Sequence, residues 1–326
     1  MAENSHISWT DHTMNFWIGC TKVSPGCKFC YAEVDTFARR ERSHGRELWG
    51  PQAERHRTSA ALWNNPYKWN KKKWEECTEC GWRGPVSETH VDCPSCDGEI
   101  LKPTRQRVFC QSLSDICEAH SMITDDMRKE IVKIVLDCQN LDFLFLTKRI
   151  ENFNFIWLEL FGGKLPDNLW VGTSVENQEY ADKRIPELLK VPAKIRFLSC
   201  EPLLGPVDIL EAVKKRDLSS KPLVKPDGYS DGIDWVIVGG ESGKNARPMH
   251  VDWARSLRDQ CENSVGQAAF HFKQWGEWFP TFAGAGSPGG SLQKTFTFPD
   301  GRVMWKVGKK NSGRLLDGKE YNEFPK

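Results

Sequence analysis

The stretch GCTKVSPGCKFCYAE, residues 19–33, carries three cysteines at positions 20, 27 and 30. It follows an apolar run at residues 14–18, which predicts a strand, and precedes a helical pattern at residues 32 to about 42. Pro25 and Gly26 favour a tight loop between the two elements. Backbone N–H groups and the positive end of the helix dipole favour thiolate anions there. The stretch therefore predicts a strand-to-helix loop suited to a metal centre.

Cys20, Cys27 and Cys30 suit an iron–sulfur cluster with an open position. Three thiolates leave one iron of a cubane [4Fe–4S] cluster without a protein ligand. Substrates and cofactors coordinate metals at such open positions. Two other interpretations stay open at this point: a zinc site completed by His44 or His56, and buried free cysteines.

A second set of cysteines forms two C-x-x-C knuckles within residues 77–96, namely Cys77, Cys80, Cys93 and Cys96. Four thiolates at this spacing predict a closed tetrahedral Zn²⁺ site in a zinc ribbon. A closed site leaves no position for substrate, so its role would be structural or in recognition. A second iron–sulfur cluster and unligated thiols are the alternatives.

Short apolar segments alternate with helical patterns along most of the chain, which predicts an α/β fold with a parallel sheet. The expected strands are residues 14–18, 107–111, 143–146, 169–173, 195–199, 235–238 and 269–273. The expected later helices are residues 124–140, 150–160, 178–189 and 251–262. The order of these elements does not decide between an open sheet and a partial barrel.

Four regions follow from this pattern. Residues 1–42 hold the first strand–helix unit with the cysteine loop, and residues 43–106 form an insertion with the four-cysteine set. Residues 107–280 hold the remaining strand–helix units. Residues 281–326 form a C-terminal extension, which begins as a loop rich in Gly, Ser and Pro and continues as a β-hairpin around Asp300 and Gly301.

The cysteine loop, together with the segments SLSDICEAH, DFLFLTKR, LWVGTSVEN, RFLSCEPLLGP, DWVIVGGESG and FKQWGEW, resembles a phage-associated three-cysteine-motif family that is radical-SAM-like. The resemblance runs from about Ser8 to the C-terminus. The spacing here is C-x6-C-x2-C, whereas C-x3-C-x2-C is the commonest in radical S-adenosylmethionine enzymes. The resemblance implies a partial parallel (β/α)6-type barrel, a [4Fe–4S] cluster, S-adenosylmethionine at its open iron, and an external electron donor. It also implies a separately encoded partner protein.

Polar residues follow the expected strands, and ligands of parallel α/β folds bind at the carboxyl ends of strands. Lys148 or Arg149 would hold the carboxylate of S-adenosylmethionine, and a nearby carboxylate would hold its ammonium group. The Gly-Gly-Glu at residues 239–241 resembles the methionine-binding motif of radical enzymes, although there it follows the second strand and here the sixth. A plain strand-end turn is equally compatible. The candidate cofactor-binding residues are Ser112, Asp115, Lys148, Arg149, Ser174, Glu176, Asn177, Gly239, Gly240 and Glu241.

Cys200 ends the fifth expected strand, so its thiol is a candidate hydrogen-atom donor in the barrel mouth. The alternative is a small residue packed in the core. Residues 39–74 combine arginines and lysines with tryptophans, and Trp69 and Trp74 flank Lys71–Lys73. Such a segment can pair with phosphates and stack on bases, which predicts a nucleic-acid contact; the alternative is a solvated loop whose tryptophans pack on the barrel.

The 326 residues, 39% of them hydrophobic, allow a large core. The net charge of +1 by itself says nothing about partners, so the local basic runs carry the nucleic-acid argument. Neither a membrane span nor a secretion signal is recognisable, so we expect a cytoplasmic protein. The cysteine loop, the family resemblance and the basic segment together favour a radical S-adenosylmethionine enzyme acting on a nucleic acid or nucleotide, in modification or repair. Two alternatives are a non-catalytic zinc-stabilised nucleic-acid-binding protein and a metal-dependent barrel hydrolase using Asp115, Glu176 and Glu241.

Overall fold

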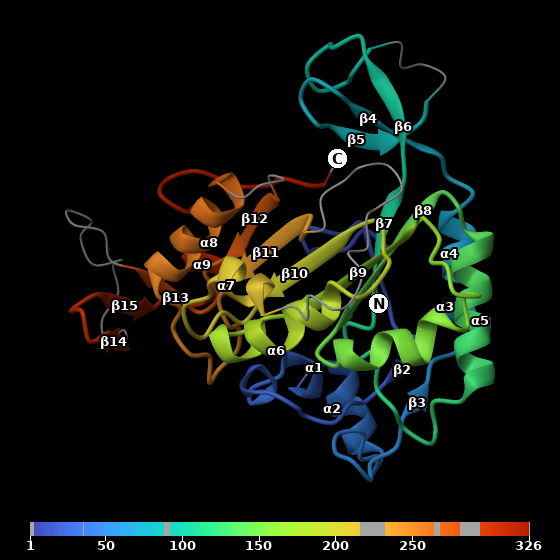
Figure 1. Cartoon of the computed structure of the whole chain (residues 1–326), viewed down its shortest axis with the longest axis horizontal. Coiled ribbons are helices and arrows are strands. Elements are labelled where there is room, and N and C mark those ends of the chain that lie inside the picture. Colours follow the sequence, from blue (N-terminus) through green and yellow to red (C-terminus); the bar gives the residue numbers. More distant parts are fainter. Residues whose placement is uncertain are drawn as a thin grey trace.

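The protein is built around a seven-stranded parallel sheet with the order β1-β7-β8-β9-β10-β11-β12 (Figure 1). This computed structural model describes residues 3–34, 36–87, 92–215, 232–263, 268–280 and 294–325. Every neighbouring pair in the sheet is parallel. The strands are β1 (His12–Met14), β7 (Gln106–Cys110), β8 (Leu141–Thr147), β9 (Leu169–Ser174), β10 (Arg196–Cys200), β11 (Trp235–Gly239) and β12 (Ala269–Gln274).

The sheet curls into a half-barrel that stays open, because its edge strands β1 and β12 do not pair. Trp9 shows the curl directly, since its ring lies 4.6 Å from Phe109 in β7 and 6.2 Å from Trp235 in β11. The parallel α/β class expected from the sequence is confirmed. The open half-barrel agrees with the expected partial barrel, and its seven strands are one more than the (β/α)6 type has.

The first expected strand, residues 14–18, was wrong in its extent. The chain leaves the sheet after Met14, and β2 (Trp17–Ile18) pairs antiparallel with β3 (His56–Arg57). Side-chain hydrogen bonds turn the chain away: Asn15 Oδ1 accepts from the Leu113 N–H at 2.7 Å, and Gln111 Oε1 accepts from the Phe16 N–H at 2.7 Å. Both contacts are buried and come from residues far apart in the sequence, so an apolar run could not reveal them.

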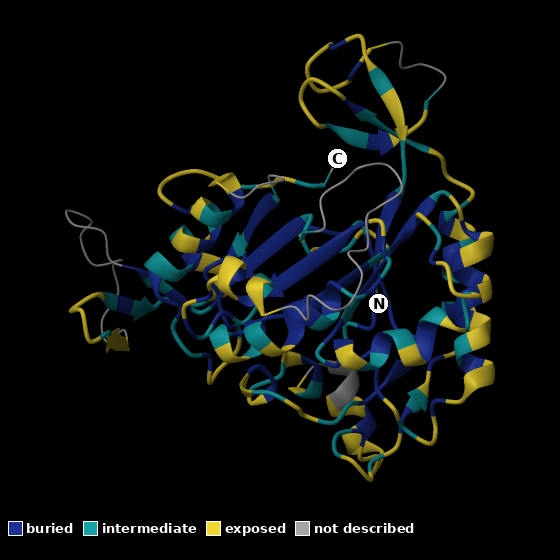
Figure 2. Ribbon diagram, viewed as in Figure 1, coloured by how far each residue is buried: buried dark blue, intermediate teal, exposed yellow. Residues whose placement is uncertain are grey.

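Helices cover the outer face of the sheet, and the strands beneath them are buried along their length (Figure 2). The principal ones are α5 (Asp125–Asp137), α6 (Gln178–Leu188), α7 (Ile209–Lys214) and α8 (Val251–Asn263). Thr124 and Asn177 cap α5 and α6 by accepting from the backbone N–H three residues later. The helix expected at residues 150–160 is instead a 3₁₀ turn (Ile150–Asn152) followed by a π-helical segment (Asn154–Leu158).

Strand alternation divides the core into two layers. Outward residues such as Val108, Phe145 and Leu198 pack against the helices. Inward residues such as Phe109, Leu144 and Phe197 form a smaller cluster with Trp9 inside the half-barrel. Gly172 is needed in this inner layer, because a Cβ there would lie 2.5 Å from the Phe197 ring. The inner layer forms a floor beneath the carboxyl ends of the strands.

Two small sheets stand beside the half-barrel (Figure 1). In the first, β4 (Trp74–Cys77) pairs antiparallel with β5 (Arg83–Pro85) and β6 (Leu101–Thr104). In the second, β15 (Val303–Lys306) pairs antiparallel with β13 (Trp278–Pro280) and β14 (Thr295–Thr297). The loop rich in Gly, Ser and Pro between β13 and β14 lies outside the described residues. The remaining helices are α1 (Tyr31–Val34), α2 (Thr36–Ser43), α3 (Ala60–Trp63), α4 (Asn65–Trp69) and α9 (Lys309–Ser312).

No helix in the described ranges combines the length and the apolar character that a bilayer crossing requires.

Candidate functional site

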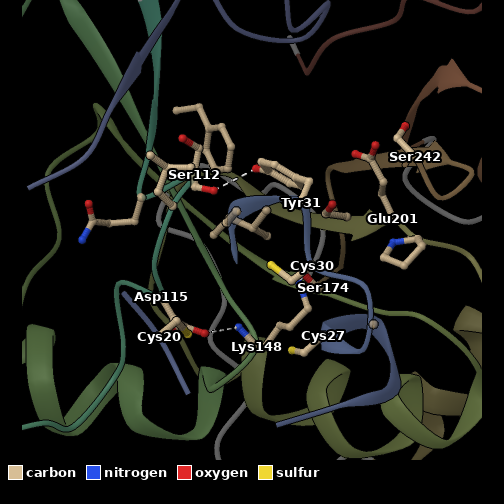
Figure 3. A pocket seen from close by; sticks show the side chains of 18 of the residues that line it. Cys20, Cys27, Cys30, Tyr31, Ser112, Asp115, Lys148, Ser174, Glu201 and Ser242 are labelled. Atoms are coloured by element: carbon tan, nitrogen blue, oxygen red, sulfur yellow. Dashed lines mark hydrogen bonds between the residues drawn. The ribbon is translucent and has the colours of Figure 1, made fainter. Parts of the chain in front are cut away.

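A cavity of about 490 Å³ opens at the carboxyl ends of the parallel strands and is lined by all three cysteines of the first loop (Figure 3). This volume suits a small molecule or cofactor. Polar residues from the ends of β7 to β12 complete the lining. Among the predicted cofactor-binding residues, those that line the cavity are Ser112, Asp115, Lys148, Arg149, Ser174, Gly240 and Glu241.

Three strand ends hold the cysteine loop in place. After β8, Arg149 donates from Nη2 to the Thr21 carbonyl at 2.6 Å and from Nη1 to Cys20 Sγ at 3.7 Å. After β11, Arg247 donates from Nη2 to the Pro25 carbonyl at 3.0 Å. After β9, Glu176 accepts from the hydroxyl of Ser24 at 2.6 Å. The loop is therefore fixed by side chains that follow three separate strands.

Glu176 lies beneath the loop and not in the cavity, which corrects its expected role. It is fully buried, it accepts from Arg184 at 2.8 Å, and a Cβ on Gly26 would lie 2.5 Å from its Oε1. Gly26 therefore permits the loop to approach this carboxylate. The side chain of Asn177 caps α6. Gly239 packs against Glu201, because a Cβ on Gly239 would lie 3.2 Å from the Glu201 side chain. Neither residue lines the cavity.

The other two candidate carboxylates are also engaged by arginines. Asp115 accepts from Arg149 at 3.0 Å and from the Thr147 hydroxyl at 2.6 Å. Glu241 accepts from Arg247 through both oxygens, at 2.5 and 2.8 Å. Both carboxylates therefore position the arginines that hold the cysteine loop.

Burial makes the thiolate form of two cysteines costly. Burial, reinforced by the Asp115 carboxylate, raises the pKa of Cys20 to about 12. Burial also raises the pKa of Cys30, and the nearby Lys148 ammonium opposes this shift. For Lys148, burial alone would lower the pKa, but Glu176 and the thiolates of Cys27 and Cys30 outweigh it and raise the pKa. Lys148 also donates from Nζ to Ser174 Oγ at 3.0 Å.

An iron–sulfur cluster fits these residues. Three soft sulfur donors line one cavity, and a bound metal would supply the positive charge that buried thiolates need. Neither His44 nor His56 lines the cavity, so neither completes a zinc site with the three cysteines as the alternative required. His44 bonds through Nδ1 to the Arg40 carbonyl, and His56 Nδ1 accepts from Arg46 at 2.8 Å.

Gln111 is a cavity residue that sequence reasoning missed. Its side chain is 2% exposed, and among the described residues its amide Nε2 has no hydrogen-bond partner. Its φ of 66° is unusual for a residue other than glycine. Strained backbone and an unsatisfied buried donor are both typical of ligand sites. No pattern in the sequence marks the residue, because it simply ends an apolar strand.

Cys200 does not face the cavity, and the expectation that it points into the barrel mouth was wrong. Its neighbours Ser199 and Glu201 line the cavity, whereas Cys200 is fully buried in the outer core. Side chains of a strand alternate between faces, so one residue of register decides the difference. Burial strongly raises the pKa of this thiol.

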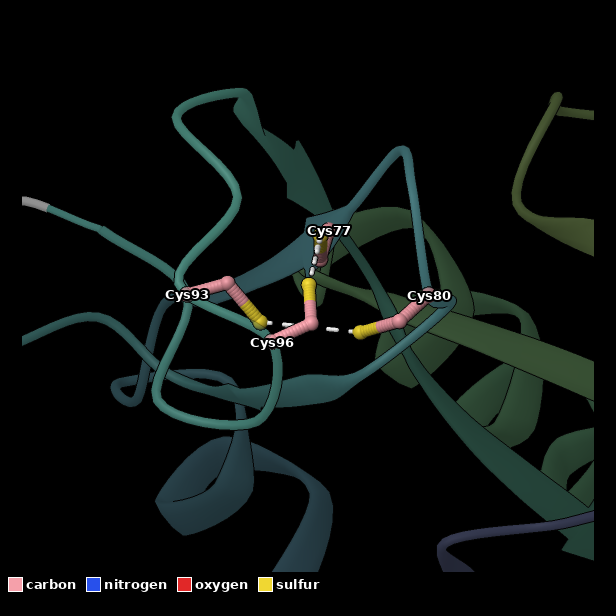
Figure 4. A group of neighbouring side chains, drawn as sticks. All are labelled: Cys77, Cys80, Cys93 and Cys96. Carbon is pink, nitrogen blue, oxygen red and sulfur yellow. Dashed lines mark hydrogen bonds between the residues drawn. The ribbon is translucent and has the colours of Figure 1, made fainter.

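The four cysteines of the insertion form a separate group at one end of the sheet of β4, β5 and β6, with Cys77 at the end of β4 and the others in connecting loops (Figure 4). Their Sγ atoms all lie within 4.8 Å of one another, with 3.7 Å between Cys77 and Cys96 and 3.6 Å between Cys80 and Cys93. Tetrahedral Zn²⁺ with bonds of about 2.3 Å separates its sulfurs by about 3.8 Å. The group is thus already arranged to bind a metal ion, and none of its members lines the cavity.

Part of the basic and aromatic segment at residues 39–74 is internal. Trp69 is 3% exposed and stacks on His12 with ring centres 4.2 Å apart, so it is not free to stack on bases. Arg55 is fully buried and forms two 2.7 Å bonds to Glu118. The lysines of this segment remain exposed, and they are Lys68, Lys71, Lys72 and Lys73.

The family described as "Protein of unknown function (DUF5131)" matches residues 4–325, and the chain belongs to this family. No curated protein matches the chain. Among solved structures, a mutant of spore photoproduct lyase is similar with a TM-score of 0.42 and 10% identity, over 94% of this chain and 71% of that one. A second mutant of the same lyase has a TM-score of 0.31 and 12% identity, over 66% of this chain and 57% of that one. TM-scores this low do not establish a shared fold.

Proposed function

We propose that the protein is a radical S-adenosylmethionine enzyme whose [4Fe–4S] cluster is held by Cys20, Cys27 and Cys30. One observation carries the proposal: the three thiols line a single cavity at the carboxyl edge of a parallel half-barrel, in a loop that three strand ends hold in place. When bound, the cluster supplies one electron to S-adenosylmethionine, which releases methionine and a 5′-deoxyadenosyl radical that takes a hydrogen atom from substrate.

The chain's own residues divide into two groups in this proposal. Arg149, Asp115, Glu241 and Arg247 position the cysteine loop, because each already holds another member of the group or the loop itself. Lys148 and Ser174 are the side chains that bind the carboxylate of S-adenosylmethionine, since Lys148 is a partly buried cation beside Cys27 and Cys30. Gly240 places its backbone in the lining of the same cavity.

The metal-dependent hydrolase is not favoured by the geometry. Asp115, Glu176 and Glu241 each accept from an arginine, so this set provides no open carboxylate cage for a divalent cation. The non-catalytic alternative leaves the cysteine-lined cavity without a purpose.

Further proposals concern the partners. The substrate is a nucleic acid or nucleotide undergoing modification or repair, and the exposed lysines of residues 39–74 would meet its phosphates. The four-cysteine group binds structural zinc. An external donor supplies the electron in the cytoplasm, and a separately encoded partner protein takes part.

The test uses protein purified and reconstituted without oxygen. We expect wild type to bind about four irons in the loop site and to form 5′-deoxyadenosine when dithionite and S-adenosylmethionine are added. Cys27→Ala should lose the iron and keep the zinc, whereas the control Cys138→Ala, in the core, should keep both. Wild-type protein without iron after reconstitution, or Cys27→Ala protein with a full complement, contradicts the proposal.

A further inference from the structure

The cavity has a second polar end that the cysteine loop does not use. Its side chains come from Glu201 after β10, Ser242 after β11, Lys273 and Gln274 in β12, and Lys309 in α9. We call these five residues the lysine end. Figure 3 shows Glu201 and Ser242 beside one another, at the opposite end of the view from Cys20 and Asp115.

Hydrogen bonds order most of the lysine end and leave specific atoms unused. Lys273 donates from Nζ to both oxygens of Glu201 at 2.7 Å. Gln274, 9% exposed, donates from Nε2 to Ser242 Oγ at 2.9 Å and to Glu201 at 3.3 Å. Ser242 is thereby used as an acceptor, so its own O–H remains to donate, as does one N–H of Lys273. The network holds these donors in place for a ligand.

Lys309 adds a cation that the network does not neutralise. Among the described residues, its ammonium group has no hydrogen-bond or ion-pair partner. Lys309 is exposed at the rim of the cavity. Partial loss of hydration and the neighbouring Lys273 cation lower its pKa, and the Glu201 and Glu277 carboxylates oppose this shift. The charged side chains of the lysine end are two cations, Lys273 and Lys309, and one carboxylate, Glu201, so one positive charge is left over. Glu277 is near Lys309 but does not line the cavity.

The geometry points to a phosphate-binding substrate subsite at the lysine end, completed by Lys309 from the C-terminal extension. The inference deepens the proposed function and rests on it, because the cluster and its cofactor would fill the cysteine end. Three separate donors, Lys273, Lys309 and Ser242, match the three terminal oxygens of a phosphomonoester better than the two of a carboxylate.

The size of the cavity narrows the substrate further. The whole cavity of about 490 Å³ excludes a duplex, and the cluster and its cofactor would take the cysteine end of it, so no more than one phosphorylated unit reaches the lysine end at a time. Gln111 Nε2, which has no partner in the described part of the chain, lies on the same lining and offers a donor to the rest of that unit. The substrate class is therefore a nucleoside monophosphate, free or as the phosphorylated end of an unpaired strand.

Binding is measured by calorimetry on the full chain with its metals. The probes are the four ribonucleoside 5′-monophosphates, each compared with its own nucleoside, and inorganic phosphate. We expect at least one monophosphate to bind about ten-fold more tightly than its nucleoside. Lys309→Ala should bring that ratio close to one, and Lys309→Arg should restore part of it. Lys310→Ala, an exposed neighbour outside the cavity, is the matched control and should leave the ratio unchanged.

Two outcomes overturn the inference: no phosphate probe binds in the millimolar range, or Lys309→Ala still binds the monophosphate more tightly than its nucleoside by the wild-type factor. A single-stranded oligonucleotide that competes only when Lys309 is present would identify a strand as the source of the phosphate. None of these measurements needs a reductant. Failure to form 5′-deoxyadenosine would therefore refute the proposed function alone, while an unchanged ratio would refute the subsite alone.

Discussion

At the scale of the residue, Arg149 connects the sheet to the cysteine loop. It is 8% exposed, pairs with Asp115, and donates to Cys20 Sγ and to the Thr21 carbonyl. A donor and a positive charge beside a cluster thiolate stabilise the reduced, more negative state. Arg149→Met should therefore make the midpoint potential of the cluster more negative by about 60 mV, the one-electron equivalent of a ten-fold change.

The measurement is a redox titration followed by electron paramagnetic resonance, with iron content and melting temperature recorded in parallel. Arg149→Lys keeps the charge and should show a smaller shift. An unchanged potential in Arg149→Met protein that retains its iron would remove this residue from any tuning role.

His271 makes stability depend on pH. It is fully buried, its Nε2 bonds to Ser8 Oγ at 2.8 Å, and burial together with the Arg314 and Arg107 cations lowers its pKa to about 3. The folded state keeps this imidazole neutral, whereas the unfolded chain protonates it below its ordinary pKa of 6.5. The contribution of His271 to the free energy of unfolding is therefore fully present above pH 6.5. It falls as the pH is lowered, by at most about 1.4 kcal/mol per pH unit.

Urea unfolding at about pH 7.5 and about pH 5.5 tests this dependence. We expect His271→Gln to lose about 1 kcal/mol less than wild type over this interval, because glutamine does not titrate. Equal losses in the two proteins would show that other groups control the acid sensitivity.

At the scale of the element, the sheet of β4, β5 and β6 has few apolar residues of its own. Cys77 and Cys93 are buried in it, while Cys80 and Cys96 are exposed. If the four-cysteine group binds zinc as proposed, this short three-stranded sheet should depend on the metal for folding. Cys93→Ala should release one zinc per chain and expose residues 74–104 to limited proteolysis.

The parallel sheet should survive this change, because none of the four cysteines packs in its core. Circular dichroism and the iron content of the loop site measure that survival, and Cys138→Ala is the control. Cleavage spread across the whole chain would mean that the insertion supports the half-barrel.

At the scale of the whole molecule, both chain ends fill the inside of the open half-barrel. Trp9 packs from the N-terminal side, and Phe324 lies 5.1 Å from Trp235 and 5.5 Å from His271. The Arg107 guanidinium also lies 3.5 Å from the centre of the Phe324 ring. Phe324→Ala should therefore lower the free energy of unfolding by about 2 kcal/mol. Phe155→Ala, at a ring that is 86% exposed, should change it by less than about 0.5 kcal/mol.

Denaturant unfolding of the two variants gives both values. If the two losses were equal, the C-terminal segment would not be part of the folded core.

Much of the sheet could be predicted from the sequence, because buried parallel strands need continuous apolar runs. Six of the seven expected strands match observed ones to within two residues at both ends; the first runs four residues too far, because hydrogen bonds from Gln111 and Asn15 turn the chain away after Met14. The cysteine loop was predictable from its spacing and from the strand and helix around it. The helix at residues 150–160 was predicted as regular, and its 3₁₀ and π segments were not.

The sequence by itself determined which residues are candidates for the proposed chemistry: the cysteine trio, the four-cysteine group and the polar strand ends. Only the tertiary structure decided how they are used. Strand alternation turned Ser199 and Glu201 into the cavity and Cys200 into the core. Folding also brought Arg149, Arg184 and Arg247 against the carboxylates of Asp115, Glu176 and Glu241. Lys309 reached the cavity through the C-terminal extension. These outcomes depend on long-range packing and register, which no local pattern of residues records.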